Sequence, residues 1–149
     1  MSDTHVAWMF ELSVKEGRDG DLSALMAEMA GATERNEPGT LDYEWYLSDD
    51  GRRVHLFERY IHSQAVMAHL AAFNERYMKR FFGILEPKRL VMYGAPDEAV
   101  RDAMSQLAPE VLQQAAGFSR RGLTASPAAA AASAAAAAAS GATSAAPPG

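Results

Sequence analysis

Two strand patterns on either side of an Asp50-Gly51 pair constrain the fold of this chain most. TLDYEWYL precedes the pair and RRVHLFERYI follows it. Asp-Gly is a strong hairpin signal because both residues tolerate a positive φ. A loop that is symmetric about the pair places Leu47, Trp45, Tyr43 and Leu41 opposite Val54, Leu56, Glu58 and Tyr60. One face of the hairpin is therefore apolar except for Glu58, which lies across from Tyr43.

The other face of the hairpin is amphipathic. It carries an Asp42–Arg59 pair across the ladder and a mixture of polar and aromatic residues beside it. Such a face is neither plainly solvent-facing nor plainly core, and it suits a contact between subunits. We therefore predict a homodimer in which the two sheets face each other.

The chain before the hairpin reads as a strand followed by a helix. Residues 6–14 alternate large apolar residues with a mixed set, which is typical of a half-buried strand. Asp21 can cap the helix that follows, because its side chain can accept hydrogen bonds from first-turn amides. Pro38-Gly39 ends that helix and turns the chain into the hairpin.

The chain after the hairpin reads as helix, strand and helix. Ser63 can cap a helix whose apolar stripe contains Val66, His69, Leu70, Phe73 and Tyr77. A further helical stretch leads to a last strand over residues 88–93. Asp97 can cap a third helix, and Pro109 can start a short helical continuation through residues 111–115.

This order of elements predicts an α+β, ferredoxin-like βαββαβ fold with a four-stranded antiparallel sheet and two helices on one face. We assign residues 4–96 to this domain and residues 97–122 to a C-terminal helical extension. Residues 123–149 are rich in Ala and Ser and carry no charge and no aromatic ring. Such a segment buries too little apolar surface to offset its ordering entropy, so we expect a disordered or partly helical tail.

Composition excludes several classes of function. A formal net charge of −5 argues against a nucleic-acid surface, and the absence of cysteine excludes thiolate catalysis, disulfides and cysteine-based metal sites. We see no signal peptide and no apolar run long enough to span a bilayer, so we expect a cytoplasmic protein without a membrane partner. The phosphate-binding glycine motifs are also absent, which gives flavin and nicotinamide cofactors no support.

Three segments carry a family resemblance. VKEGRDGDL follows the first strand, EPGTLDYEWY lies in the middle, and HLFERYIHSQAVMAHL leads into the second helix. Together they resemble the antibiotic biosynthesis monooxygenase-like family, over about residues 6–93. The resemblance implies a dimeric α+β barrel. That family includes cofactor-independent oxygenases of quinols and polyketide-type aromatics, haem-degrading enzymes, and enzymes of small aldehydes or signal molecules.

The haem-degrading branch does not match this chain. That branch has an asparagine in the first strand, a tryptophan in the second helix and a histidine about three turns further on. The chain has Phe10 and His69 at the first two positions, Lys79 and Arg80 near the third, and no histidine after His69. We therefore expect no bound haem, and the four histidines show no spacing suited to a metal site.

His69 and Glu58 are the candidate catalytic residues. An imidazole in an apolar pocket can take a proton from a phenol or hydroquinone, and a nearby carboxylate can orient it. Candidate substrate-binding residues are Tyr43, Trp45, Trp8, Tyr60 and Phe73, whose rings can stack on a planar molecule. Each of these residues also has a purely structural interpretation, as part of the core or as the partner in one buried hydrogen bond.

The functional hypothesis is a cofactor-independent monooxygenase. It would act on a quinol or polyketide-type aromatic substrate with dioxygen, in a pocket between the second helix and the sheet. His69 would assist deprotonation, and the resulting carbanion would donate an electron to dioxygen. Two alternatives stay open at this point: a non-catalytic dimeric binding module, and an enzyme that isomerises or degrades a small carbonyl compound.

Overall fold

The computed structural model describes residues 3–120. The tail assigned to residues 123–149, and the last two residues of the extension, lie outside the described residues. The elements in chain order are β1 (Val6–Val14), α1 (Asp19–Asn36), β2 (Thr40–Leu47), β3 (Arg53–Tyr60), α2 (Ser63–Arg76), α3 (Met78–Ile84), β4 (Leu85–Gly94), α4 (Glu98–Met104), the 3-10 helix η1 (Ser105–Leu107) and β5 (Glu110–Leu112).

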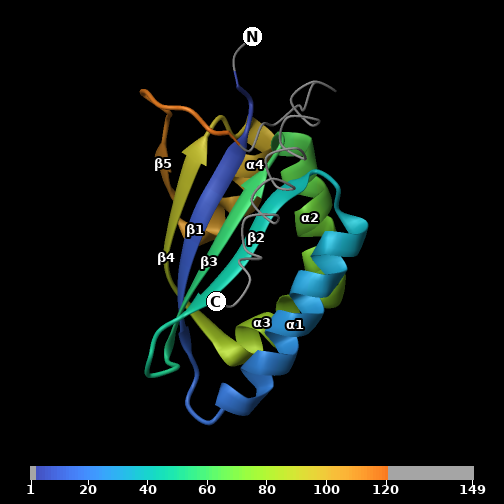
Figure 1. Ribbon diagram of the computed structural model, residues 1–149, viewed down its shortest axis with the longest axis vertical. Coiled ribbons are helices and arrows are strands. Elements are labelled where there is room, and N and C mark those ends of the chain that lie inside the picture. The colour runs from blue at the N-terminus through green and yellow to red at the C-terminus, as the bar shows by residue number, and fades with distance from the viewer. Residues whose placement is uncertain (1–2, 121–149) are drawn as a thin grey trace, which may run out of the picture. The chain divides into compact units, whose positions relative to one another are not determined.

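The strands form one sheet in the order β2-β3-β1-β4-β5. The first four pair antiparallel, and Figure 1 shows the helices gathered on one side of them. The predicted ferredoxin-like α+β fold is therefore confirmed. The described sheet has five strands, however, because β5 adds to the edge of β4 in parallel. The prediction of a four-stranded sheet was wrong in this respect.

The fifth strand replaces the helical continuation predicted after Pro109. Ala108 has a left-handed φ of 47°, which ends η1 and redirects the chain. Residues 110–112 then pair with residues 91–93 of β4. An edge strand offers a row of unpaired backbone groups, and these partners favour an extended segment over another turn of helix.

Two of the three predicted helix caps were wrong. Helix α1 begins at Asp19 with no side-chain cap, and Asp21 instead accepts a hydrogen bond from Arg18 Nε at 2.7 Å. Helix α2 is capped by His62, whose Nδ1 accepts from the backbone N–H of Ala65 at 3.1 Å. The Asp97 cap on α4 is confirmed, with its Oδ1 accepting from Val100 N–H at 3.0 Å.

The hairpin register is confirmed along most of its length. Leu47 pairs with Val54, Trp45 with Leu56, and Tyr43 with Glu58. A bulge between Thr40 and Asp42 shifts the far end, so that Thr40 rather than Leu41 lies opposite Tyr60. The apolar face of the hairpin covers one side of the core, and Glu58 and His69 are buried there together.

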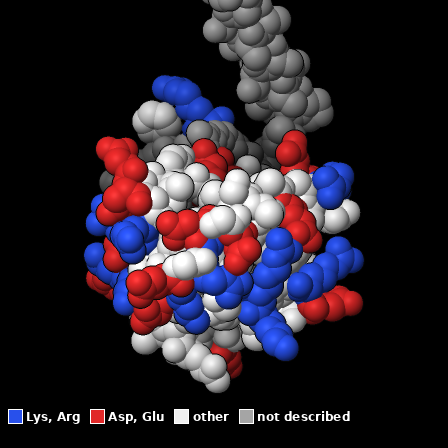
Figure 2. Space-filling view, turned by 90° about the horizontal axis from the view of Figure 1, so that it is seen from below, with Lys and Arg blue, Asp and Glu red and all other residues white. Residues whose placement is uncertain are grey.

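The outer face of the sheet keeps the predicted Asp42–Arg59 pair, and beside it Glu44 pairs with Phe57 and Tyr46 with His55. No helix among residues 3–120 is long and apolar enough to cross a membrane. Over the face of the described chain seen in Figure 2, cationic and anionic side chains are interspersed, without a large area of one sign.

The homodimer stays a prediction, and the outer face of the sheet is where we expect the contact. Light scattering should give a mass twice that of the 16.1 kDa chain at micromolar concentration. Phe57→Glu puts a charge on this half-buried face and should yield monomer, because an unpaired charge in an interface is costly. Met67→Glu, on the exposed surface of α2, is the matched control. A monomeric wild-type protein would contradict the prediction.

Candidate active site

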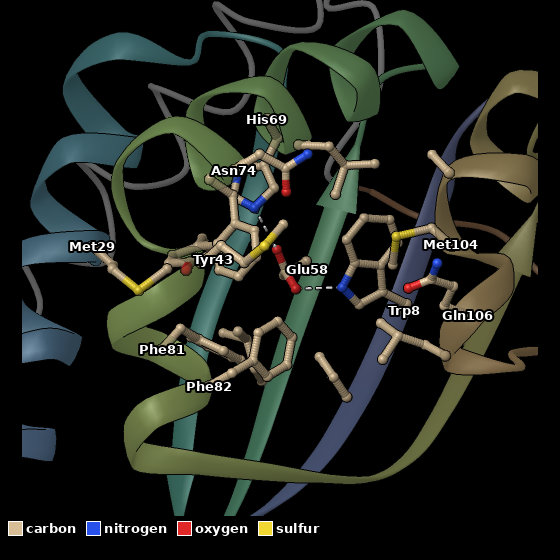
Figure 3. A pocket seen from close by; sticks show the side chains of 17 residues that line it. Trp8, Met29, Tyr43, Glu58, His69, Asn74, Phe81, Phe82, Met104 and Gln106 are labelled. Atoms are coloured by element: carbon tan, nitrogen blue, oxygen red, sulfur yellow. Dashed lines mark hydrogen bonds and ion pairs between the residues drawn. The ribbon is translucent and has the colours of Figure 1, made fainter.

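A cavity of about 350 Å³ lies between the sheet and the helices. Figure 3 shows its side chains, which come from every layer of the fold. The sheet and α1 contribute Trp8, Phe10, Met29, Tyr43, Leu56 and Glu58. Helices α2 and α3 contribute His69, Leu70, Phe73, Asn74, Met78, Phe81 and Phe82, and the segment after β4 contributes Ala103, Met104, Gln106 and Leu107. The wall is apolar and aromatic apart from a small polar group around His69 and the separate side chain of Gln106.

His69 is held between two carboxylates. Its Nδ1 lies 2.7 Å from Oε1 of Glu37, and its Nε2 lies 3.1 Å from Oε1 of Glu58. The three side chains come from the end of α1, from β3 and from α2. The side chain of Glu37 is 14% exposed, that of Glu58 4% and that of His69 7%. We call this group the Glu37–His69–Glu58 triad.

Glu58 accepts two further hydrogen bonds on the floor of the cavity. Tyr60 donates its hydroxyl to Oε1 at 2.6 Å, and Trp8 donates its indole N–H to Oε2. The strand register explains this convergence, because Trp8 is the direct neighbour of Glu58 on β1 and Tyr60 lies two residues along the same face of β3. With His69, three donors therefore point at the oxygens of one carboxyl group and fix its position.

His69 is positively charged at neutral pH. Burial lowers the pKa of its imidazolium, but hydrogen bonds to Glu37 and Glu58 and their negative charges outweigh burial and raise that pKa to about 9. Burial, followed by the charge of Glu58, raises the pKa of Tyr43 and Tyr60 above its ordinary value, so both hydroxyls stay protonated. The cavity thus presents the His69 cation and the Glu58 carboxylate, with Glu37 on the far side of His69, which is an arrangement suited to proton transfer and to stabilising an anionic ligand.

The sequence model of one family, described as antibiotic biosynthesis monooxygenase, matches residues 6–82, which is more than half of the chain. The chain belongs to the antibiotic biosynthesis monooxygenase family. No curated protein sequence matches it. The family membership supports a monooxygenase in general terms and leaves the substrate open.

Solved structures agree with this family fold. MupZ from Pseudomonas fluorescens matches with a TM-score of 0.67 at 22% identity, over 78% of this chain and 94% of that protein. Rv0793 from Mycobacterium tuberculosis matches with a TM-score of 0.54 at 28% identity, over 64% and 99%. A Nitrosomonas europaea protein, provisionally named an antibiotic biosynthesis monooxygenase, matches with a TM-score of 0.55 at 21% identity, over 64% and 93%.

Within this family fold, five of the seven residues predicted for the site line the cavity: His69, Glu58, Tyr43, Trp8 and Phe73. Tyr60 and Trp45 do not line it. Tyr60 is fully buried behind Glu58 and acts on the cavity only through its hydrogen bond. The ring of Trp45 packs against those of Tyr43 and Phe81, at centroid distances of 6.2 and 6.0 Å, so Trp45 supports the wall from outside.

Sequence reasoning missed Glu37. Its carboxylate is fixed by His69 and by the hydroxyl of Thr40, which donates to Oε1 at 3.0 Å. The turn after it packs tightly on α2, since a Cβ on Gly39 would lie 2.7 Å from the Cβ of Ala65. Ala65 lies one helical turn before His69, so this close approach brings Glu37 to the imidazole. The Glu-Pro-Gly signal marked the turn, but the long-range contact came from its packing.

Four further missed residues lie beyond the part of the chain that the antibiotic biosynthesis monooxygenase model matches. Ala103, Met104, Gln106 and Leu107 belong to α4 and η1 and line the cavity. They were assigned to an extension without a functional role, because helical periodicity does not show which face meets a cavity.

Proposed function

We propose that this family member oxidises a quinol or polyketide-type aromatic substrate with dioxygen, without a bound cofactor. The observation that carries the proposal is the Glu37–His69–Glu58 triad, of which His69 and Glu58 line a mainly apolar cavity of about 350 Å³ and Glu37 lies behind His69. Cofactor-independent oxidation needs a substrate that becomes an anion, and a buried acid–base group with a fixed cation provides the means.

The charge state of the triad assigns its roles differently from the sequence interpretation, which made His69 the proton acceptor. With both nitrogens engaged and a pKa of about 9, the imidazole already carries its proton at neutral pH. We therefore assign proton acceptance to Glu58, the carboxylate that lines the cavity. His69 supports the substrate anion by its positive charge, and Glu37 keeps that charge in place.

The oxidation balances without an external reductant, and a quinol enters the same step through its keto tautomer, which carries a ring CH₂ group. A substrate with an acidic CH₂ group loses one proton to Glu58, and the carbanion gives an electron to dioxygen. The two radicals join through a C–O bond, and the peroxide then breaks its O–O bond. One oxygen atom remains as a new carbonyl and the other leaves as water with both hydrogens of the CH₂ group. The substrate carbon supplies all four electrons that dioxygen takes up.

The cavity volume favours a compact planar substrate. About 350 Å³ lies near the lower end of the range of roughly 300–1,000 Å³ for small-molecule sites. Phe73, Phe81 and Phe82 pack edge to face at 5.1–6.0 Å on one wall and offer ring surfaces for stacking. Trp8 lies on the opposite wall (Figure 3). A two- or three-ring aromatic is therefore the substrate size that we expect.

Oxygen uptake with anthrone tests the proposal. Anthrone has an acidic CH₂ opposite a ketone on its central ring, and ¹⁸O₂ should place one labelled oxygen in the anthraquinone formed. We expect uptake well above the uncatalysed autoxidation rate, with one O₂ consumed per product. Uptake at the autoxidation rate, with anthrone and with 1,4-naphthohydroquinone, would contradict the proposal. Binding without turnover would then favour a binding module, and turnover of a small carbonyl compound without oxygen uptake would favour the isomerase alternative.

A further inference from the structure

The segment after β4 lines the cavity on the side away from His69, where Ala103 and Gln106 are exposed to solvent. Figure 3 shows Met104 and Gln106 beyond the indole of Trp8, with His69 on the opposite side of Glu58. Leu107 joins them in the lining. A ligand that reaches Glu58 with its reacting carbon and extends past Trp8 would therefore contact α4 and η1 with its other end.

This segment is firmly attached to the rest of the fold. The backbone N–H of Ala95 donates to the carbonyl of His5 at 3.0 Å, and that of Asp97 donates to Oγ of Ser63 at 2.9 Å. Gly94 has a φ of +100°, and a Cβ there would lie 2.3 Å from the carbonyl oxygen of His5. Only glycine permits this entry into the segment. The far end is fixed by β5, which pairs with β4.

Its side chains combine size restriction with one free polar group. Met104 is only 5% exposed and packs in the core, so its position is well defined. Gln106 lines the cavity, and its amide has no hydrogen-bond partner among the described residues. Gln106 is exposed at the rim, so its amide can exchange a bound water for a carbonyl or hydroxyl of a ligand.

We propose that α4 and η1 form the specificity wall of the cavity. Met104 and Leu107 limit the length of the substrate, and Gln106 hydrogen-bonds a carbonyl or hydroxyl on the end remote from Glu58. The inference rests on the proposed function for the orientation of the substrate. It goes beyond family membership, because this wall lies outside the matched residues 6–82. In anthrone, the ketone lies opposite the acidic CH₂, so Gln106 would donate to the oxygen that gains negative charge.

Anaerobic calorimetric binding tests the size restriction separately from turnover. The probes are hydroquinone, 1,4-naphthohydroquinone and anthrone, with one, two and three rings. Met104→Trp should weaken anthrone binding at least about tenfold, about 1.4 kcal/mol, and change hydroquinone binding little, because the added ring fills the remote end. Met104→Ala enlarges the remote end, so it should shift binding in favour of anthrone over hydroquinone. Met67→Trp, on the exposed surface of α2, is the control. If Met104→Trp does not fold, Leu107→Trp takes its place.

A second comparison tests Gln106. Gln106→Leu keeps the volume of the side chain but removes the amide. It should weaken the binding of anthrone about tenfold and leave the binding of 9,10-dihydroanthracene, which lacks the ketone, unchanged. Equal losses for both probes, or a Met104→Trp effect that is uniform across the three ring sizes, would overturn the inference. Size-selective binding without oxygen uptake would leave the wall intact and refute only the proposed reaction. If no probe binds the wild-type protein, both the specificity wall and the proposed reaction are wrong.

Discussion

Replacing Glu58 by glutamine is expected to lower the rate of anthrone oxidation by about 10²–10⁴-fold, the usual contribution of a positioned acid–base group. The amide keeps the size of the carboxylate but cannot accept the substrate proton. It also turns an N–H₂ group towards donors from Trp8, Tyr60 and His69, all of which now point at carboxylate oxygens. The measurement is the initial rate of oxygen uptake per folded protein, with near-ultraviolet circular dichroism to report tertiary packing.

Tyr60→Phe is the matched control for Glu58→Gln. It removes one donor from the same carboxylate and creates no new group, because Tyr60 is buried behind Glu58 and does not line the cavity. We expect it to retain most of the activity. A wild-type rate in Glu58→Gln would remove Glu58 as proton acceptor. Equal losses in the two variants would show that the carboxylate only supports the fold of the site.

The parts of the site that the sequence predicted are those set by local periodicity. A strand has a side-chain period of two, so the Asp50-Gly51 turn was enough to place Glu58 opposite Tyr43. A helix has a period of 3.6, so the apolar stripe turned His69 towards the same face. One hairpin and one helix that packs on it therefore gave the centre of the site.

The parts that sequence did not predict depend on packing between distant segments. Glu37 meets His69 only because the turn at Gly39 packs against Ala65. The contact with Glu37 helps to keep His69 protonated. Because the sequence did not reveal this contact, His69 was assigned the role of proton acceptor. The alternation of the strand also placed Tyr60 on the same face as the lining residues. Tyr60 is buried too deeply to reach the cavity, and periodicity does not encode that depth.

The conformation of the chain at the edge of the sheet also depends on a contact between distant segments that sequence patterns do not show. Pro109 has the properties of a helix start, and the sequence alone gave no reason to prefer a strand after it. The unpaired edge of β4 is a tertiary feature, and it decides the conformation of residues 110–112. As a result, the segment that carries Met104 and Gln106 is held at both ends and completes the cavity wall.

The stability of the protein is expected to fall by roughly 3 kcal/mol between pH 6 and pH 9.5 because of His69. Burial lowers the pKa of this group, but Glu37 and Glu58 raise it from 6.5 to about 9 in the folded protein. A group whose pKa is raised on folding stabilises fully below its unfolded value and loses that contribution as the pH rises through its folded value. Above pH 9 the folded state therefore keeps two buried carboxylates without the cation between them. Urea unfolding at fixed pH steps measures the fall.

Variants of the triad separate this effect from other titrations. Glu37→Gln leaves one carboxylate on His69, so the pKa of the imidazolium, followed by NMR of its ring protons, should drop and the loss of stability should move to lower pH. His55→Gln removes a more exposed histidine that lies 3.1 Å from Glu11, and it should leave the pH dependence unchanged, because exposed pairs contribute little. Measurements stay below pH 10, where tyrosine ionisation in the unfolded chain begins to matter. A wild-type pH dependence in Glu37→Gln would mean that the two carboxylates do not hold the charge on His69, and the role of His69 as a fixed cation would then fail.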